Sequence, residues 1–420
     1  MEMLTTRAGG SRPLPIAELN IASPQFKANP YAFYARLRRE APVFPVTLPD
    51  KQTAWLVTRY DDVVMVLKDD RFAKDRRNAL TPEQLARQPW IPSFAKPLTR
   101  NMLDLDPPDQ TRLRILVQKA FTPRLVEQMR ERIQTLTDEL LDAVNGKSPF
   151  DLIRDYALPV PTTIIAEMLG VPVDDRHKFH RWSKALLGAS STRSGIWTAL
   201  PSIWLFMRYL RKFIRLRRAR PQDDLVSALV QAEEAGEKLT EDELLALVML
   251  LLVAGHETTV NPIGNGTLAL LENPDQMDKL RSDPTLIKPA IEELLRFHSP
   301  VEMATERFPR REVTVAGIQI PRGEMVLAVI ASANRDESQF TDPDKLDLTR
   351  EPNRHVSFGQ GVHFCLGAPL ARLEGQLAIN TLLRRAQGLR LGVAHSALRW
   401  RRGLVLRGLE SLPLAVSEWK

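Results

Sequence analysis

The chain contains 420 residues, of which 44% are hydrophobic and 26% charged, an ordinary globular composition that can bury a sizeable core. Its single cysteine excludes an internal disulfide, and no apolar run reaches the roughly 18 residues of a membrane span. The net charge of +7 suits an acidic partner, but none of the usual nucleic-acid motifs accompanies it. We therefore expect a cytoplasmic protein that has no transmembrane anchor and binds no nucleic acid.

Helical periodicity dominates the chain, with apolar residues recurring every three or four positions. In chain order the predicted helices cover residues 31–40, 61–68, 111–120, 123–144, 161–169 and 223–235. Strand-like alternation is confined to residues 53–58 and 313–329, where Gly317 and the pair Arg322 and Gly323 supply turns. The pattern predicts a mainly α fold with a small β-rich region.

A basic amphipathic helix is predicted over residues 202–220. Its apolar positions are Ile203, Phe206, Met207, Leu210 and Phe213, and its cationic positions are Arg208, Arg211, Lys212, Arg215, Arg217, Arg218 and Arg220. Two interpretations of this helix stay open. It either touches an anionic lipid surface or acts as a lid whose charged face is solvated.

The most unusual predicted element is a helix from Thr240 to Glu272, roughly 50 Å long at 1.5 Å per residue. Thr240 and Glu243 form a capping-box pattern at its start. Its middle contains residues with poor helix propensity, namely Gly255, Thr258, Thr259, Pro262, Gly264 and Gly266. Because Pro262 cannot donate to the Thr258 carbonyl, we expect a kink there. The kink is either an incidental bend of a buried helix or a functional opening.

The only cysteine lies within residues 358–367, Phe-Gly-Gln-Gly-Val-His-Phe-Cys-Leu-Gly, immediately before a predicted helix at 368–386. Backbone N–H groups at a helix N-terminus lower the pKa of a thiol and favour the thiolate, which is the form that binds a metal. Gly359, Gly361 and Gly367 permit tight turns or the close approach of a flat cofactor. By itself, Cys365 is either such a ligand or a small buried apolar residue.

This stretch resembles the F-G-x-G-x-H-x-C-x-G haem loop of the cytochrome P450 family, and every defined position matches. The resemblance implies that Cys365 is the axial ligand of a haem b iron, with Phe358, Gly359, Gly367 and Ala254 beside the cofactor. It extends over residues 21–420, which implies one mainly α domain with the haem between the long kinked helix and the Cys365 loop. Residues 1–20 would then be a flexible N-terminal extension.

Residues 254–259 are similar to the oxygen-activation signature of the same family, with Glu257 and Thr258 as adjacent acid and alcohol. Cleavage of O2 consumes two protons, which a carboxylate and a hydroxyl can relay through ordered water. The Thr258 hydroxyl can also bond the Ala254 carbonyl four residues back. The family pattern leaves the position of His256, directly before Glu257, variable, so we treat His256 as structural.

Glu293 and Arg296 lie three positions apart on one predicted helix face. Without other evidence such a pair is usually a solvated surface contact. It matches the E-x-x-R motif of the family, in which a later arginine joins the pair, and Arg350 fits that place. The resemblance implies that these three residues are structural and support the haem loop.

The resemblance also implies cationic partners for the two haem propionates. Arg114, Arg307 and His363 match the family's positions for this role. Gln110 departs from the pattern, because many relatives carry histidine there, which implies a weaker or neutral contact.

The regions that form the substrate pocket in the family are mostly apolar here, which predicts a substrate bound mainly by apolar contact. The candidate lining residues are Trp90, Ile91, Phe94, Leu186, Leu187, Val253, Ala254, Val301 and Met303. Each of them either lines the pocket or simply fills core. A fatty acid, steroid, terpenoid or polyketide would suit such a lining.

These features predict a haem-dependent monooxygenase that inserts one atom of O2 into an apolar small molecule by hydroxylation or epoxidation. Since no flavin or ferredoxin domain is recognisable, we expect electrons from NAD(P)H to arrive through a separate ferredoxin or flavodoxin with its reductase. Arg112, Lys119 and Arg372 are candidate docking charges for that partner. The alternatives are a peroxide-driven peroxygenase on the same fold and a non-catalytic haem-binding sensor.

Overall fold

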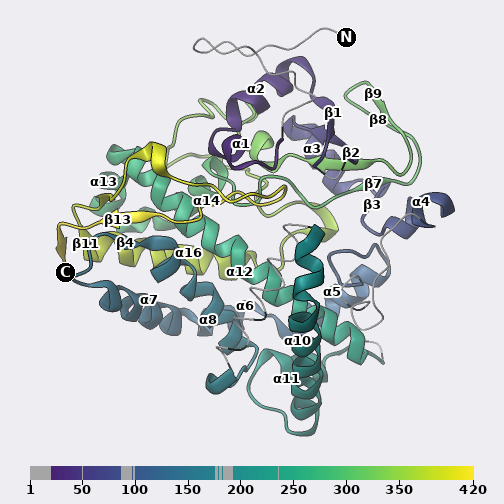
Figure 1. Cartoon of the computed structure of the whole chain (residues 1–420), viewed down its shortest axis with the longest axis horizontal. Coiled ribbons are helices and arrows are strands. Elements are labelled where there is room, and N and C mark those ends of the chain that lie inside the picture. Colours follow the sequence, from purple (N-terminus) through teal and green to yellow (C-terminus); the bar gives the residue numbers. More distant parts are fainter. Residues whose placement is uncertain are drawn as a thin grey trace.

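Helices make up most of the protein in the computed structural model, which describes residues 20–49, 51–86, 97, 100–175, 178, 182, 193–234 and 236–420 (Figure 1). The first seven are α1 (Pro24–Ala28), α2 (Tyr31–Glu40), α3 (Tyr60–Lys68), α4 (Pro82–Ala86), α5 (Asp109–Ala120), α6 (Pro123–Gln128) and α7 (Arg130–Val144). The others are α8 (Pro159–Met168), α10 (Arg193–Ala219), α11 (Leu225–Gln231), α12 (Glu241–Glu272), α13 (Pro274–Ser282), α14 (Ile287–Phe297), α15 (Ile330–Ala333) and α16 (Ala368–Arg385).

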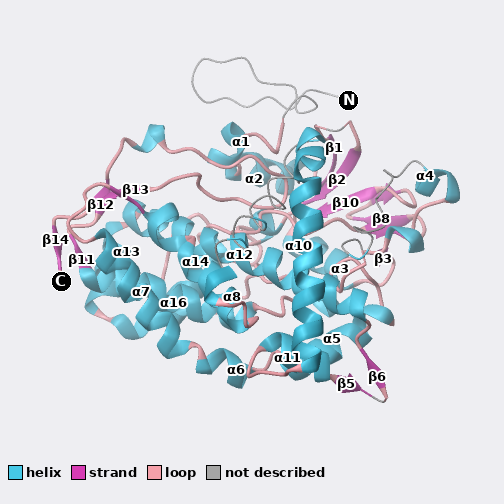
Figure 2. Ribbon diagram, turned by 60° about the horizontal axis from the view of Figure 1, so that its bottom comes forward, coloured by secondary structure: helices cyan, strands magenta, loops and turns pink. Residues whose placement is uncertain are grey.

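The strands form small sheets on two opposite sides of the helical part (Figure 2). On one side are β1 (Val43–Thr47), β2 (Thr53–Val57) and β10 (Met325–Ala328), the pair β3 (Phe72–Ala73) and β7 (Phe308–Pro309), and the hairpin β8 (Val313–Val315) and β9 (Ile318–Ile320). On the other are β4 (Phe150–Asp151), β12 (Arg390–Leu391) and β13 (Pro413–Ala415), with β11 (Ala386–Gln387) and β14 (Glu418–Trp419). The predicted mainly α fold with a small β-rich region is confirmed.

Two predicted helices are wrong in extent. The helix expected over 123–144 is divided at Met129, which ends α6 and precedes α7. The helix expected over 223–235 ends at Gln231, and the chain continues into the two-stranded hairpin β5 (Glu233–Glu234) and β6 (Glu237–Lys238). Gly236 takes a positive φ of 81° between those strands, so the turn residue outweighs the helical periodicity.

Helix α12 begins and ends as its sequence predicts. The Thr240 side chain and the Glu243 carboxylate form the reciprocal capping box, and Pro262 lies inside the helix. By length and composition α12 could also cross a membrane, but it packs against α8, α10, α14 and α16 as a central helix of the protein. A Cβ on Gly264 would lie 2.5 Å from Ile153, so the glycine permits close packing at this point of the helix. This packing explains why a residue of poor helix propensity stands there.

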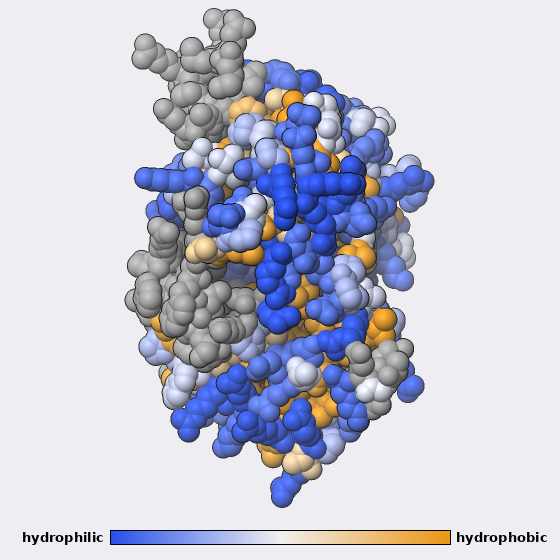
Figure 3. Space-filling view, turned by 90° about the vertical axis from the view of Figure 1, so that its right-hand side faces the viewer, coloured by the Kyte–Doolittle hydropathy of each residue, from blue (hydrophilic) through white to orange (hydrophobic). Residues whose placement is uncertain are grey.

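Helix α10 is longer than predicted and buries its apolar face. Ile203, Phe206, Met207, Leu210 and Phe213 are all buried in the main core. On the other face, Arg211 and Arg215 form ion pairs of 3.3 and 3.1 Å with Asp242 and Glu241 in the first turn of α12. Hydrophilic side chains cover most of the described surface in the view of Figure 3, with hydrophobic ones between them in small areas. The predicted apolar face is therefore occupied by the protein's own core, whereas Trp204, Leu205 and Leu216 of the same helix are exposed.

Glu374, on α16, joins that helix to the middle of α12. Its carboxyl is buried and receives a hydrogen bond from the Thr259 hydroxyl, whereas Oε2 has no hydrogen-bond partner among the described residues. Burial raises the pKa of Glu374 to about 8, although the Thr259 hydrogen bond lowers it. A charged carboxylate would be costly at this position, so the folded protein holds the proton.

This raised pKa predicts a pH-dependent stability that Glu374→Gln should remove. The pKa of Glu374 in the folded protein exceeds the ordinary value of 4.5. The stability gained by holding this proton is therefore fully present below pH 4.5 and is lost as the pH rises towards 8. The neutral amide keeps the shape and does not titrate. Relative to the variant, the wild-type free energy of unfolding should fall by up to about 1.4 kcal/mol per pH unit in this window. Urea unfolding across this pH range measures the difference, and parallel curves for the two proteins would contradict it.

Candidate functional site

The Cys365 loop lies directly before α16, as predicted. The Cys365 N–H donates to the Phe358 carbonyl over 2.9 Å, which closes the loop. Gly359 and Gly361 both take positive φ, and a Cβ on Gly361 would lie 2.9 Å from the Leu67 carbonyl oxygen. These two glycines therefore serve the tight turn and the close contact with α3.

The thiol of Cys365 is accessible, yet it lies among protein atoms. Burial raises its pKa, while the N–H groups of Gly367 and Ala368 and the charge of Arg114 lower it. The helix N-terminus thus acts in the predicted direction, although burial acts against it and raises the pKa overall. A bound metal ion would add a further positive charge at the sulfur and favour the thiolate.

The loop also exposes apolar side chains beside the thiol. Val362 is 48% and Phe364 is 38% exposed. A Cβ built on Gly367 would meet no atom within 4 Å. This side of the loop therefore offers apolar surface and free space, as a flat apolar cofactor requires.

Two buried cations face each other where β3 meets β7. The pairing of Ala73 with Phe308 places Lys74 opposite Arg307 in the next position, and both side chains are buried. Burial and mutual repulsion lower the pKa of Lys74 to about 8, and burial lowers the pKa of Arg307 to about 10. Like charges opposite each other in a sheet are unfavourable, so the pair needs an anionic partner.

Two further residues of the predicted propionate set, Arg114 and His363, lie near this pair. Burial and the charges of Arg307, Lys74 and Arg114 lower the pKa of His363 to about 3. Among the described residues, no carboxylate forms a salt bridge with Lys74, Arg307, Arg114 or His363. The structure therefore brings together the three predicted propionate contacts and adds Lys74, which sequence reasoning missed because only the strand register places it there.

Gln110 contacts the Cys365 loop itself. Its side-chain amide donates to the Val362 carbonyl over 2.8 Å, and Arg114 donates to the same oxygen over 3.2 Å. The Gln110 side chain is buried at the start of α5. In this position it holds the loop through its backbone, which agrees with the weak or neutral cofactor contact that we expected.

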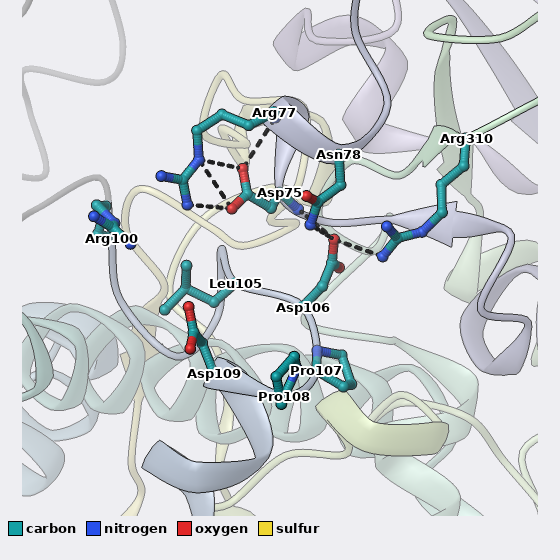
Figure 4. Close-up of a pocket in the computed structure, with 10 residues that line it drawn as sticks. All are labelled: Asp75, Arg77, Asn78, Arg100, Leu105, Asp106, Pro107, Pro108, Asp109 and Arg310. Carbon is teal, nitrogen blue, oxygen red and sulfur yellow. Dashed lines mark hydrogen bonds and ion pairs between the residues drawn. The ribbon is translucent and has the colours of Figure 1, made fainter.

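Two arginines of the neighbouring polar pocket, Arg77 and Arg310, have carboxylate partners, by contrast (Figure 4). This pocket of about 470 Å³ contains Arg77, which pairs with Asp75, and Arg310, which donates to Asp106 over 2.9 Å. Asn78 donates to the same Asp106 carboxylate over 2.8 Å. The pocket thus has paired charges of both signs, and the cations around Lys74 and Arg307 are the ones that suit an anionic ligand.

The middle of α12 carries the predicted acid and alcohol. The Thr258 hydroxyl donates to the Ala254 carbonyl, as predicted. Ala254 is exposed, and Val253, Glu257 and Thr258 are half-buried, although the helix is buried from Thr259 to Ile263 apart from Pro262. This segment therefore keeps accessible surface in the middle of α12. The side chain of His256 lies outside the described part.

The three residues of the predicted structural triad contact one another. Arg296 donates to both oxygens of Glu293 over 2.7 Å, and Arg350 donates to the same carboxylate over 3.2 Å. Arg296 also donates to the carbonyls of Asn334 and Pro343. Glu293 and Arg296 are completely buried, so the pair is internal and is not the surface contact that its spacing alone would suggest.

The predicted substrate residues have different outcomes. Five of them, Trp90, Ile91, Phe94, Leu186 and Leu187, lie outside the described residues. Val253 and Val301 are half-buried. Met303 is wrong as a lining residue, because its side chain is fully buried in a core cluster with Tyr34 and Met325 and has no accessible surface for a ligand.

Two of the proposed docking charges are held by the protein's own carboxylates. Arg112 pairs with Glu243, and Arg372 donates to both oxygens of Glu292 over 2.7 and 2.8 Å. These pairs neutralise the charges that an acidic partner would use, so Arg112 and Arg372 are weaker docking candidates than their sequence positions indicated.

The residues present fit a haem. Cys365 offers a sulfur ligand on an apolar, accessible loop, and the cations around Lys74 and Arg307 can neutralise two propionates. The class that this fold and site define is a haem-thiolate protein.

The chain belongs to the cytochrome P450 family, whose sequence model matches residues 9–387. Cytochrome P450 107B1 of Saccharopolyspora erythraea is 47% identical, over 91% of this chain and 93% of the relative. The 6-deoxyerythronolide B hydroxylase of the same species is 40% identical, over 94% and 98%. The structure of the polyketide synthase cytochrome P450 PksS of Bacillus subtilis superposes with a TM-score of 0.89 at 41% identity, covering 95% of this chain and 100% of PksS. The chain is accordingly a P450 monooxygenase, an enzyme class that uses haem iron and O2.

Proposed function

We propose that this enzyme hydroxylates or epoxidises an apolar small molecule of the polyketide type, with Cys365 as the iron ligand. The observation that carries the proposal is the joint placement of an accessible thiol at the start of α16 and buried cations around Arg307 that have no carboxylate partner among the described residues. When bound, the haem supplies the activation of O2 and the oxidation of the substrate.

Three cations, Lys74, Arg307 and Arg114, and the neutral His363 imidazole would hold the haem propionates. Lys74 and Arg307 approach from β3 and β7, His363 from the Cys365 loop, and Arg114 from α5. Binding of two carboxylates would relieve the repulsion that lowers the pKa values of His363 and Lys74. The cations therefore give both affinity and a defined orientation of the cofactor.

Glu257 and Thr258 would move protons into the site. A carboxylate with access to water can take a proton from solvent and pass one on through ordered water to the Thr258 hydroxyl. Each transfer returns Glu257 to the carboxylate, so the relay consumes only protons from water. The bond from the Thr258 hydroxyl to the Ala254 carbonyl holds the hydroxyl on the accessible side of α12.

The substrate class is inferred from an apolar wall and from the relatives. Val253, Ala254 and Val301 present apolar atoms with accessible surface. The names of two relatives refer to polyketide biosynthesis and to 6-deoxyerythronolide B hydroxylation. Electrons would come from NAD(P)H through a separate ferredoxin or flavodoxin with its reductase.

The acid–alcohol pair favours this reaction over the two alternatives. Hydrogen peroxide already brings both oxygen atoms and the protons, so a peroxygenase does not need Glu257 and Thr258. A haem-binding sensor that does no chemistry would not need a proton relay either.

Thr258→Ala tests the proposed function. With a substrate chosen by its spectral shift of the ferric enzyme, the variant should consume NADPH but lose product roughly 10²-fold, the lower range for a proton-transfer group. The missing electrons should appear as hydrogen peroxide. Thr258→Ser keeps the hydroxyl and should retain most of the coupling. Unchanged coupling in Thr258→Ala would exclude the relay, and full activity with peroxide alone would favour the peroxygenase.

A further inference from the structure

The Glu257 carboxylate has an ion-pair partner near the other end of the chain. Arg401 Nη1 donates to Glu257 Oε1 over 3.4 Å. The two side chains are 31% and 28% exposed, so water reaches the pair. A group that must exchange protons with solvent is therefore held by a cation at a position open to water.

Arg401 belongs to a hairpin of residues 400–409 that is fixed on both sides. The backbone pairs Trp400 with Leu409, and the Arg401 N–H donates to the Gly408 carbonyl over 2.9 Å. The Arg401 side chain also donates from Nε to the Leu409 carbonyl over 3.1 Å. Buried Arg407 stacks on the Trp400 ring at 3.7 Å, which stiffens the hairpin further. The guanidinium of Arg401 is thus presented in one orientation.

The hairpin contacts one face of α12. Glu257, Asn261 and Asn265 are spaced four residues apart, so they lie on the same side of the helix. The Asn265 side chain donates to the Arg407 carbonyl over 2.9 Å. A Cβ on Gly408 would lie 2.0 Å from the Asn261 Oδ1, so any larger residue there would have to displace the Asn261 side chain. These contacts determine where Arg401 meets Glu257.

Thr258 lies about 100° further round the helix than Glu257, on the side where its hydroxyl bonds the Ala254 carbonyl. The acid and the alcohol therefore present their side chains in different directions, and protons must cross between them through water. A freely rotating carboxylate would spend much of its time away from that path. A charge-assisted hydrogen bond that fixes the carboxylate keeps it on the proton path.

We propose that Arg401 is a positioning residue, which holds the ionised Glu257 carboxylate where it can take up protons from solvent and return them to the site. The inference rests on the proposed relay through Glu257. Arg401 itself transfers no proton, because its guanidinium stays charged throughout. Arg401 therefore affects proton delivery only while Glu257 is present.

Arg401→Gln and Arg401→Lys test the inference in the intact haem enzyme. We expect Arg401→Gln to divert roughly threefold more electrons into hydrogen peroxide, well below the roughly 10²-fold cost of losing a proton-transfer group. The solvent deuterium isotope effect on product formation should rise, because proton delivery becomes slower. Arg401→Lys keeps the charge and should restore part of the coupling. Arg402→Gln removes one exposed charge from the same hairpin and is the matched control, with wild-type behaviour expected.

A double-mutant cycle separates positioning from a structural role. In the Glu257→Gln background, Arg401→Gln should add no further uncoupling. Urea unfolding of the same four proteins should show a non-additive loss of stability, a readout that does not depend on turnover. Wild-type coupling and isotope effect in Arg401→Gln, or additive losses in the double variant, would overturn the inference. If Glu257→Gln alone leaves coupling unchanged, the proposed relay itself fails.

Discussion

Replacement of Cys365 by serine is expected to remove the red-shifted Soret band of the reduced carbonyl adduct and to abolish product formation. The hydroxyl has nearly the same size as the thiol, but it stays protonated and donates far less electron density to iron. Haem should still bind in part, because the cations around Lys74 and Arg307 remain. The absorption spectrum and the product yield measure the two effects separately.

The serine variant is a selective probe, because Cys365 is the only cysteine of the chain. Far-ultraviolet circular dichroism should match the wild type, which shows that the fold is intact. Arg307→Gln provides the complementary variant, which should weaken haem retention but keep the red-shifted band in the molecules that bind haem. A serine variant that keeps the band and the activity would exclude Cys365 as the ligand.

Glu293→Gln is expected to cause a large loss of stability. Glu293 is the common acceptor for Arg296, Arg350, Asn353 and the Asp347 N–H, and no accessible surface remains on its side chain. The substitution leaves two guanidinium groups without their carboxylate in the interior. Removing one member of a buried ion pair costs about 3–5 kcal/mol. Urea unfolding gives the value, and much of the variant should be produced without haem.

Glu292→Gln is the matched control on the same helix. Glu292 accepts from Arg372 and His355, but it is 27% exposed, so water can replace part of what is lost. Its substitution should cost clearly less than that of Glu293, about 1–2 kcal/mol. Equal losses in the two variants would show that burial of Glu293 does not determine its importance.

Local patterns predicted the elements that bear the chemistry. The capping box at Thr240 and the thiol before α16 depend on contacts within a few residues, and the structure contains both. The E-x-x-R pair is also local, because residues three apart on a helix meet each other. Periodicity failed where a glycine turn competed with it, at Gly236.

The sequence by itself determined the family, the thiol at a helix N-terminus and the acid–alcohol pair on a long helix, because each is a short-range pattern of side chains. Only the tertiary structure decided that Lys74 lies opposite Arg307, that Arg401 holds Glu257, and that Met303 fills core. These relations join segments that are far apart in the chain, and strand register and hairpin docking create them. No local periodicity encodes such contacts, since their energy comes from packing and charge pairing that exist only after folding.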